Sequence, residues 1–171
     1  ETSPARVLVI GGGVVGCEYA SFLAAIGVQV DIVEMLDSLL FGEDDEAVRV
    51  MAREFKKRKI NVYAKSRITE ITPGSEVTIE PETTIRNRYD AIFETTGRRP
   101  NTASLSLDAA GVKLDGKGFI AVDESLQTSA KNIYAAGDCI DTPMLAYTAA
   151  REAEAAVRHI ATGKSSRIDY R

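Results

Sequence analysis

Residues 6–16, Arg-Val-Leu-Val-Ile-Gly-Gly-Gly-Val-Val-Gly, constrain the fold more than any other stretch of this sequence. The four apolar residues 7–10 predict a strand that is buried on both faces, as parallel strands are. Gly11, Gly13 and Gly16 then fit the G-x-G-x-x-G pattern where a strand turns into a helix. In that pattern Gly11 permits the tight turn, Gly13 lets a pyrophosphate approach the backbone, and Gly16 lets the helix pack closely on the strand.

A helix is expected directly after this turn, and Gly27 is expected to end it. Apolar residues recur at helical spacing on one face, which we expect to be the buried face: Val15, Tyr19, Phe22, Leu23 and Ile26. A second strand is expected over residues 28–33. Strand, turn, helix and strand together form a unit of about 30 residues, the length of a dinucleotide-binding βαβ unit.

Glu34 closes the second strand, about 20 residues after the glycine turn. An acid at this place accepts hydrogen bonds from the hydroxyl groups of an adenosine ribose. No Arg or Lys follows Glu34 until Arg49, so nothing near it in the sequence is placed to meet a 2′-phosphate. The sequence therefore predicts NAD(H), and not NADP(H), as the ligand.

Composition narrows the class of protein further. With 44% apolar and 27% charged residues, the 171-residue chain is typical of a soluble globular protein of one domain or slightly more. The net charge of −4 argues against a nucleic-acid partner, which requires a basic surface. No apolar run approaches a membrane span and no signal peptide opens the chain, so we expect no membrane partner. Cys17 and Cys139 form no metal-ligand pattern, so we expect no metal site and a cytoplasmic location.

The following sequence predicts an α/β fold. A helix is expected over residues 44–59, with acidic residues at its start and basic residues at its end. Further parallel strands are expected over 60–64 and 89–93, and short alternating segments predict an antiparallel meander between 67 and 86. We therefore predict a Rossmann-like parallel sheet with an antiparallel β-meander. The loop 35–42 is unusually apolar, which fits packing against another part of a larger protein or local packing equally well.

The residues after 101 have a different pattern. Strands are expected at 118–122 and 132–136, the second leading into Gly137-Asp138, and a helix is expected at 146–162. We expect the buried face of this helix to carry Ala149, Ala150, Ala153, Val157 and Ile160. No second glycine fingerprint is present and no helix is expected between the two strands. These segments therefore do not complete a second nucleotide-binding unit.

Several motifs in order along the chain resemble those of the pyridine nucleotide–disulfide oxidoreductase family of flavoenzymes. They are Gly-Gly-Gly-Val-Val-Gly-Cys-Glu at 11–18, Val33-Glu34, Thr-Gly-Arg-Arg-Pro-Asn at 96–101, Tyr-Ala-Ala-Gly-Asp-Cys at 134–139 and Pro-Met-Leu-Ala-Tyr at 143–147. The resemblance runs from Arg6 to Arg171. Within the family, the chain is most similar to the dihydrolipoamide dehydrogenases and next to the mercuric reductases.

In this family the FAD domain is split in sequence and the NAD domain is inserted into it. The resemblance therefore implies an NAD(H)-binding domain at residues 1–115 and the second half of an FAD-binding domain at 116–171. It also implies a fragment of a longer protein, without the first half of the FAD domain, the redox-active cysteine pair and the C-terminal dimerisation domain. The longer protein is expected to be a homodimer that passes hydride between NAD(H) and FAD, and the fragment alone to catalyse nothing.

The resemblance also implies which residues bind the cofactors: Gly11, Gly12, Gly13, Val14, Val15, Gly16, Glu18, Glu34, Met35, Ile68, Gly97, Asp138, Met144, Leu145, Ala146 and Tyr147. The glycines of the fingerprint correspond to the pyrophosphate site and Glu34 to the adenosine ribose site. Ile68 matches the position that covers the adenine, and Gly97 the one that passes the nicotinamide side. Glu18 matches a carboxylate near nicotinamide and flavin that pairs with a Lys from the absent N-terminal part. No catalytic residue is expected in the chain.

On the flavin side, the resemblance places Asp138 on the ribityl chain of FAD and residues 144–147 along the flavin. The residues by themselves leave Asp138 open as either a ligand-binding acid or an ordinary helix cap. Two positions depart from the family: many members have an aromatic residue at Val14 that covers the nicotinamide pocket, and dihydrolipoamide dehydrogenases usually have His at Tyr147. Other functions therefore stay open, namely an NADH oxidase, a mercuric reductase-like enzyme, a reductase of an electron-transfer protein, or a stand-alone NAD-binding module.

Overall fold

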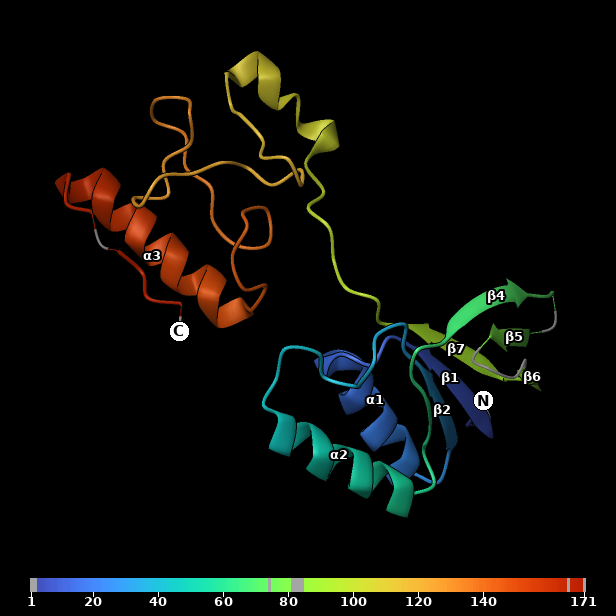
Figure 1. The fold of residues 1–171 in the computed structure, drawn as a ribbon. Coiled ribbons are helices and arrows are strands. Elements are labelled where there is room, and N and C mark those ends of the chain that lie inside the picture. The colour runs from blue at the N-terminus through green and yellow to red at the C-terminus, as the bar shows by residue number, and fades with distance from the viewer. Residues whose placement is uncertain (1–2, 74, 81–84, 166, 171) are drawn as a thin grey trace. The chain divides into compact units, whose positions relative to one another are not determined.

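The computed structural model of the chain describes residues 3–73, 75–80, 85–165 and 167–170. The chain divides into two compact units, residues 1–97 and 98–171 (Figure 1). The first unit holds both sheets and two helices, and the second holds one long helix and mostly irregular chain.

The first unit is built on a parallel sheet whose central strand is β1 (Arg6–Ile10). β1 pairs in parallel with β2 (Gln29–Val33) on one side and with β7 (Ala91–Glu94) on the other, and β2 pairs with β3 (Asn61–Tyr63). The strand order is β3-β2-β1-β7. The parallel strands expected from the sequence are confirmed. The two central strands, β1 and β2, are largely buried, whereas the edge strands β3 and β7 are only partly buried.

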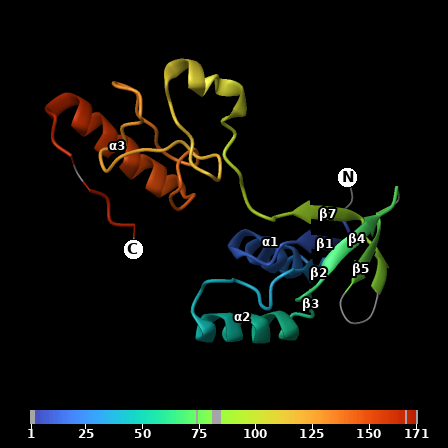
Figure 2. The same cartoon turned by 45° about the horizontal axis from the view of Figure 1, so that its top comes forward.

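Two helices cover one face of this sheet, α1 (Val14–Ala25) and α2 (Asp45–Lys57) (Figure 2). The core on this face contains Val7, Val9, Cys17, Ala20, Leu23, Val28, Val30, Ile32, Leu39, Phe55 and Ile60. The side chain of Asp44 caps α2 by accepting hydrogen bonds from the N–H groups of Glu46 and Ala47, at 2.9 and 3.3 Å. The acidic first turn and basic last turn of α2 are present as expected.

The antiparallel meander covers the other face. It consists of β4 (Arg67–Ile71), β5 (Glu76–Glu80) and β6 (Ile85–Arg88), with β5 in the middle. Its apolar residues pack on the parallel sheet in a second core cluster of Leu8, Val33, Val77, Ile79 and Tyr89. The predicted meander is therefore confirmed, although residues 74 and 81–84 lie outside the described part of the chain.

The buried face of α1 differs from the sequence expectation. Its buried residues are Gly16, Cys17, Ala20 and Leu23, whereas Val15, Tyr19, Phe22 and Ile26 are exposed. The prediction is right for Leu23 and wrong for the other four residues, because α1 is apolar on both faces and the periodicity alone does not choose between them. The small residues face the sheet because only they allow the helix to approach it closely.

The second unit contains two short 3₁₀ turns, Ala103–Leu105 and Leu107–Ala110, and the helix α3 (Ala146–Thr162). The strands expected at 118–122 and 132–136 are wrong as regular strands. The structure has only isolated antiparallel bridges there, Leu114–Ile120, Val122–Thr128 and Gln127–Tyr134. Each segment pairs with a neighbour a few residues away and turns back, so no continuous ladder forms. In the described part of the chain, no helix is long and apolar enough to cross a membrane.

The expected limits of α3 are confirmed, and Gly163 ends it with a positive φ of 66°. The expected buried face is wrong, because the buried residues of α3 are Glu152, Ala155 and Ala156. Val157 and Ile160 remain exposed. The charged side chain of Glu152 therefore faces the core, whereas apolar residues of the predicted face, such as Val157, are exposed.

A buried acid links the strands of the parallel sheet through hydrogen bonds. The side chain of Asp31, on β2, is fully buried. Its Oδ2 accepts hydrogen bonds from Arg6 Nη2 and from the Tyr89 hydroxyl, and its Oδ1 accepts one from Asn61 Nδ2, each at 2.7 Å. Burial raises the pKa of Tyr89, and its hydrogen bond to Asp31 adds to the shift. The carboxylate thus links β1, β2, β3 and the residue that leads into β7.

Replacing this acid tests how much the network stabilises the first unit. Asp31→Ala removes a buried, fully bonded carboxylate, so we expect the free energy of unfolding to fall by about 3 kcal/mol. Tyr89→Phe deletes one donor and should cost only about 1 kcal/mol. Urea unfolding of both variants and the wild type measures the difference. Equal losses for the two variants would show that Asp31 does not hold the network together.

Candidate functional site

The glycine turn lies at the carboxyl edge of the parallel sheet, between β1 and α1. Gly11 has a φ of +103°, and its N–H donates to the Val33 carbonyl at 2.8 Å. A Cβ atom at Gly16 would lie 2.0 Å from the Gly11 carbonyl oxygen. Both observations agree with the sequence expectation, because Gly11 makes the turn and Gly16 lets α1 pack against it.

Thr95, the residue that follows β7, holds this turn from the other side. Its hydroxyl lies 2.9 Å from the carbonyl oxygens of both Ile10 and Gly11, so its single proton can be donated to either. Its N–H donates to the Ile10 carbonyl at 2.8 Å. Nothing in the sequence points to this role beyond the position of Thr95 two residues before Gly97.

The N-terminus of α1 is open toward the same edge. Gly13 is the N-cap residue, it has no side chain to cap the helix, and the first turn of α1 contains no acidic residue. A Cβ atom at Gly13 would meet nothing within 4 Å. The first N–H groups of a helix lack partners within the helix and attract anions. This end of α1 therefore fits a phosphate group that approaches Gly13.

The carboxylate of Glu34 is fixed beside the turn. Its Oε2 accepts a hydrogen bond from the Gly12 N–H at 2.6 Å, and its Oε1 accepts one from the Leu36 N–H at 2.8 Å. The Ser66 N–H donates to the Glu34 carbonyl at 3.0 Å, which brings the start of β4 next to the acid. A negative charge at the end of β2 is therefore held in one orientation.

These groups surround a cavity of about 590 Å³ in the first unit. Six residues predicted for the NAD site line it: Gly11, Gly13, Glu34, Met35, Ile68 and Gly97. Gly12 and Gly16 belong to the turn beside it, whereas Val14, Val15 and Glu18 are exposed on the first turns of α1. The structure thus brings most of the predicted NAD residues together at one edge of the sheet.

The cavity also contains residues that the sequence analysis missed. Phe41 lines it from the apolar loop before α2 and is 74% exposed. Arg67 lines it from β4, where its guanidinium lies 3.2 Å from Glu80 Oε2. No Arg or Lys follows Glu34 closely in the sequence, but the expectation that nothing nearby could meet a 2′-phosphate did not consider Arg67, which lines the same cavity as Glu34 and is paired with Glu80. Arg67 was missed because the meander returns β4 to Glu34 from a distant part of the sequence.

The second unit holds the residues predicted for the flavin side. Asp138 follows Gly137, which has a φ of +80°, and its carboxylate forms an ion pair with Arg98. A Cβ atom at Gly137 would lie 3.3 Å from the Cβ of Ala149, so this turn lies against α3. The structure therefore places the Gly137–Asp138 turn beside the first turns of α3.

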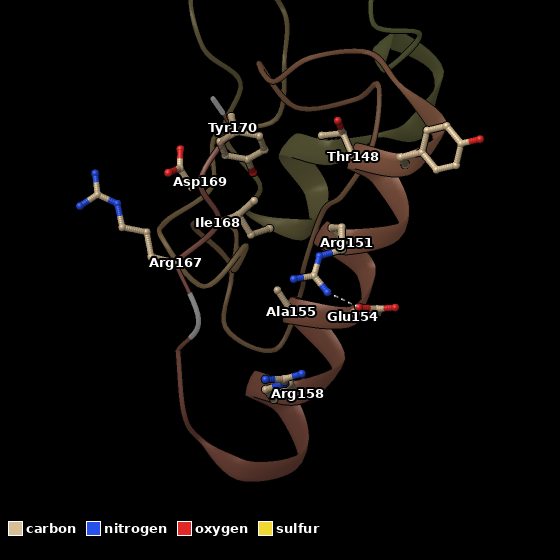
Figure 3. Close-up of a pocket in the computed structure, with 10 residues that line it drawn as sticks. Thr148, Arg151, Glu154, Ala155, Arg158, Arg167, Ile168, Asp169 and Tyr170 are labelled. Atoms are coloured by element: carbon tan, nitrogen blue, oxygen red, sulfur yellow. Dashed lines mark hydrogen bonds and ion pairs between the residues drawn. The ribbon is translucent and has the colours of Figure 1, made fainter.

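The predicted residues before and within the start of α3 are largely exposed. Leu145 is the N-cap of α3 without a side-chain cap, Ala146 is exposed, Tyr147 is 87% exposed, and Met144 is half-buried. A cavity of about 560 Å³ lies between α3 and the segment 167–170 (Figure 3). Of the residues predicted for the flavin side, Tyr147 lines it. An acid on a tight turn beside an uncapped helix start places a hydrogen-bond acceptor next to N–H groups that have no partner within the helix.

The sheet, the glycine turn and the acid after β2 define a Rossmann-like α/β fold, which binds ligands at the carboxyl edge of its strands. The chain belongs to the pyridine nucleotide-disulphide oxidoreductase family, whose model matches residues 1–153. It is 35% identical over 173 residues to a dihydrolipoyl dehydrogenase of Chlamydia pneumoniae, covering 99% of this chain and 37% of that protein. It is 36% identical over 167 residues to a dihydrolipoyl dehydrogenase of Haloferax volcanii, covering 94% of this chain and 35% of that protein.

Solved structures agree with this assignment. LpdA from Mycobacterium tuberculosis matches 98% of this chain and 37% of its own with a TM-score of 0.87 and 31% identity. The HOCl-induced flavoprotein disulfide reductase RclA from Escherichia coli matches 96% of this chain and 38% of its own, with a TM-score of 0.83 and 29% identity. The chain thus spans a little over a third of the length of the relatives it matches, and the family is one of oxidoreductases.

The contact between Thr95 and the glycine turn generates a prediction. Thr95→Val keeps the shape of the side chain but removes its hydroxyl. The turn loses one hydrogen bond, which contributes about 1 kcal/mol to its stability. We expect the dissociation constant for NADH to rise about 5-fold, because the N–H groups facing the cavity become less well ordered. Fluorescence titration measures the constant, and Thr95→Ser, which keeps the hydroxyl, serves as the control. Equal losses for the two variants would contradict the role of the hydroxyl.

Cys17, buried on α1 beneath the turn, generates a pH-dependent prediction. Burial raises the pKa of its thiol from 9.0 to about 11, and the charge of Glu34 adds to the shift. Because the folded state holds this proton more tightly, the contribution to stability is complete below pH 9 and is lost as the pH rises through 11.

The stability difference between the wild type and Cys17→Ala isolates this titration from that of other groups. We expect this difference in the free energy of unfolding to be constant below pH 9. Between pH 9 and 11 the wild type should lose stability relative to Cys17→Ala. Urea unfolding under reducing conditions at a series of pH values measures it. A difference that stays constant up to pH 11 would show that the thiol is not shielded as the structure indicates.

Proposed function

We propose that this chain is the NAD(H)-binding part, with the second half of an FAD-binding domain, of a flavin-dependent disulfide reductase similar to dihydrolipoyl dehydrogenases. In this proposal residues 1–115 bind NAD(H) and residues 116–171 contribute to the FAD site, and the longer protein is a homodimer. The observation that carries the proposal is the Glu34 carboxylate, which is fixed beside the open glycine turn on the 590 Å³ cavity.

The residues of the cavity fit the parts of NAD(H) in order. The N–H groups at the start of α1 bind the pyrophosphate next to Gly13, where the backbone is open. Glu34 accepts hydrogen bonds from the adenosine ribose, and Ile68 on β4 covers the adenine. Gly97, which also lines the cavity, lies on the nicotinamide side.

The chain's own share of the reaction is to position the two cofactors. Asp138 hydrogen-bonds the ribityl chain of the flavin, and residues 144–147 lie along the flavin. Glu18, exposed on α1, sets the charge near the nicotinamide. When bound, the nicotinamide and flavin supply the hydride chemistry. The chain alone has no redox-active cysteine pair and is expected to bind NAD(H) without turning over a disulfide.

A second candidate within the same family keeps NAD(H) and FAD but has a different acceptor. Many relatives carry an aromatic lid at Val14, and dihydrolipoyl dehydrogenases carry His at Tyr147. These two departures leave a mercuric reductase-like enzyme, an NADH oxidase or another reductase open. The absorption spectrum of the longer protein before and after anaerobic NADH separates these candidates. A long-wavelength charge-transfer band supports the disulfide reductase, simple bleaching of the flavin supports the second candidate, and absence of flavin would overturn both.

Replacing Glu34 tests the cofactor assignment. Glu34→Ala removes one or two charge-assisted hydrogen bonds to the ribose, each on the order of 1.5–3 kcal/mol. We expect the preference for NADH over NADPH to fall at least tenfold. The ratio of the two dissociation constants is the readout, because loosening of the Gly12 loop weakens both ligands alike. Glu124→Ala, the same change at an exposed position of the second unit, is the control. An unchanged ratio in Glu34→Ala would contradict the assignment.

A further inference from the structure

The second unit contains a buried acid that the proposed function does not use. Glu152 lies on α3, and its side chain has no exposed surface. Its Oε2 accepts a hydrogen bond from the Gly137 N–H at 2.6 Å, and its Oε1 accepts one from the Tyr170 hydroxyl at 3.0 Å. A buried carboxylate is costly unless such donors satisfy it. The other buried residues of α3 are Ala155 and Ala156, so a buried carboxylate among them needs an explanation.

One of these bonds fixes the backbone directly before Asp138. Gly137 adopts a φ of +80°, and its carbonyl accepts a hydrogen bond from the Ile140 N–H at 3.0 Å. With its N–H on Glu152 as well, both polar groups of Gly137 are engaged within the unit. The backbone that carries Asp138 thus has one conformation, pressed against α3 at Ala149.

The side chain of Asp138 is held separately. Its carboxylate pairs with Arg98, and it remains 41% exposed, whereas the backbone of the turn is held by Glu152. The two restraints act on different atoms, so a substitution at Glu152 loosens the turn and leaves the Arg98 side chain in place.

We propose that Glu152 is a positioning residue for the flavin site: by holding the Gly137 N–H, it orients Asp138 toward the ribityl chain of FAD without touching the cofactor itself. The inference rests on the proposed function, because it takes Asp138 as the ribityl ligand. A residue that orients a ligand-binding side chain in this way typically changes affinity at least as much as stability.

The second bond of Glu152 provides an internal control. Tyr170 belongs to the segment 167–170 that runs beside α3 (Figure 3). Burial and the hydrogen bond to Glu152 raise the pKa of Tyr170 to about 12. Tyr170→Phe removes this bond and leaves the one to Gly137 intact. This variant measures the effect of the hydrogen bond between Glu152 and the segment 167–170 separately from the effect of the bond to Gly137.

The test measures FAD affinity in the longer protein that contains this chain, by flavin fluorescence after removal and return of FAD. Glu152→Leu removes the acceptor without leaving a buried charge, and we expect the dissociation constant for FAD to rise about tenfold. Glu152→Gln, whose amide oxygen still accepts from Gly137, and Tyr170→Phe should both stay within about threefold of the wild type. If Glu152→Leu does not fold, Glu152→Asp, which shortens the side chain, replaces it with the same expected direction.

A double-mutant cycle with Asp138→Ala separates positioning from a merely structural role. If Glu152 acts through Asp138, its replacement should raise the dissociation constant for FAD little further once Asp138 is gone. Fully additive losses, or an unchanged affinity in Glu152→Leu alone, would overturn the inference while the proposed function stands. A wild-type protein that binds no FAD would overturn the proposed function and, with it, the inference.

Discussion

The close approach of α1 to β1 is the constraint on which the glycine turn and the cavity beside it depend. A Cβ atom at Gly16 would lie 2.0 Å from the carbonyl oxygen of Gly11, so no other residue fits without displacing the turn. The start of α1 lies at the cavity, which Gly13 lines, and a Cβ atom at Gly13 would meet nothing within 4 Å. The close approach also explains why small residues such as Ala20 face the sheet, since larger ones would hold the helix away.

Among the described residues, a fully buried carboxylate in each unit joins segments that are distant in sequence. Asp31 accepts three hydrogen bonds from residues on or beside three different strands, among them Tyr89. Glu152 joins the Gly137 turn to Tyr170 at the end of the described chain. Removing water from a charge is costly, so such acids persist only where the donors are already in place. They fix relative positions that apolar packing alone leaves adjustable.

The strands and turns of the first unit were predictable because each signal is local, such as the apolar run of β1 or the glycines that follow it. The buried faces of α1 and α3 could not be predicted, because both helices carry apolar side chains on two sides. In α1 the face with small residues is buried, and in α3 the face with Glu152 and two alanines is buried. Glu152 was missed because a lone acid on a helix normally faces water. Arg67 was missed because only the folded meander brings it beside Glu34.

The pairing of β7 with β1 has a consequence for the order of folding. The glycine turn occupies residues 11–16, yet the hydroxyl that braces it belongs to Thr95, 84 residues from Gly11. Contacts between such distant residues form late, because a long loop must close before they contribute. During synthesis the glycine turn leaves the ribosome well before Thr95 has been added to the chain. A nascent chain that ends before residue 95 therefore carries the complete glycine motif but lacks the hydroxyl that holds the turn.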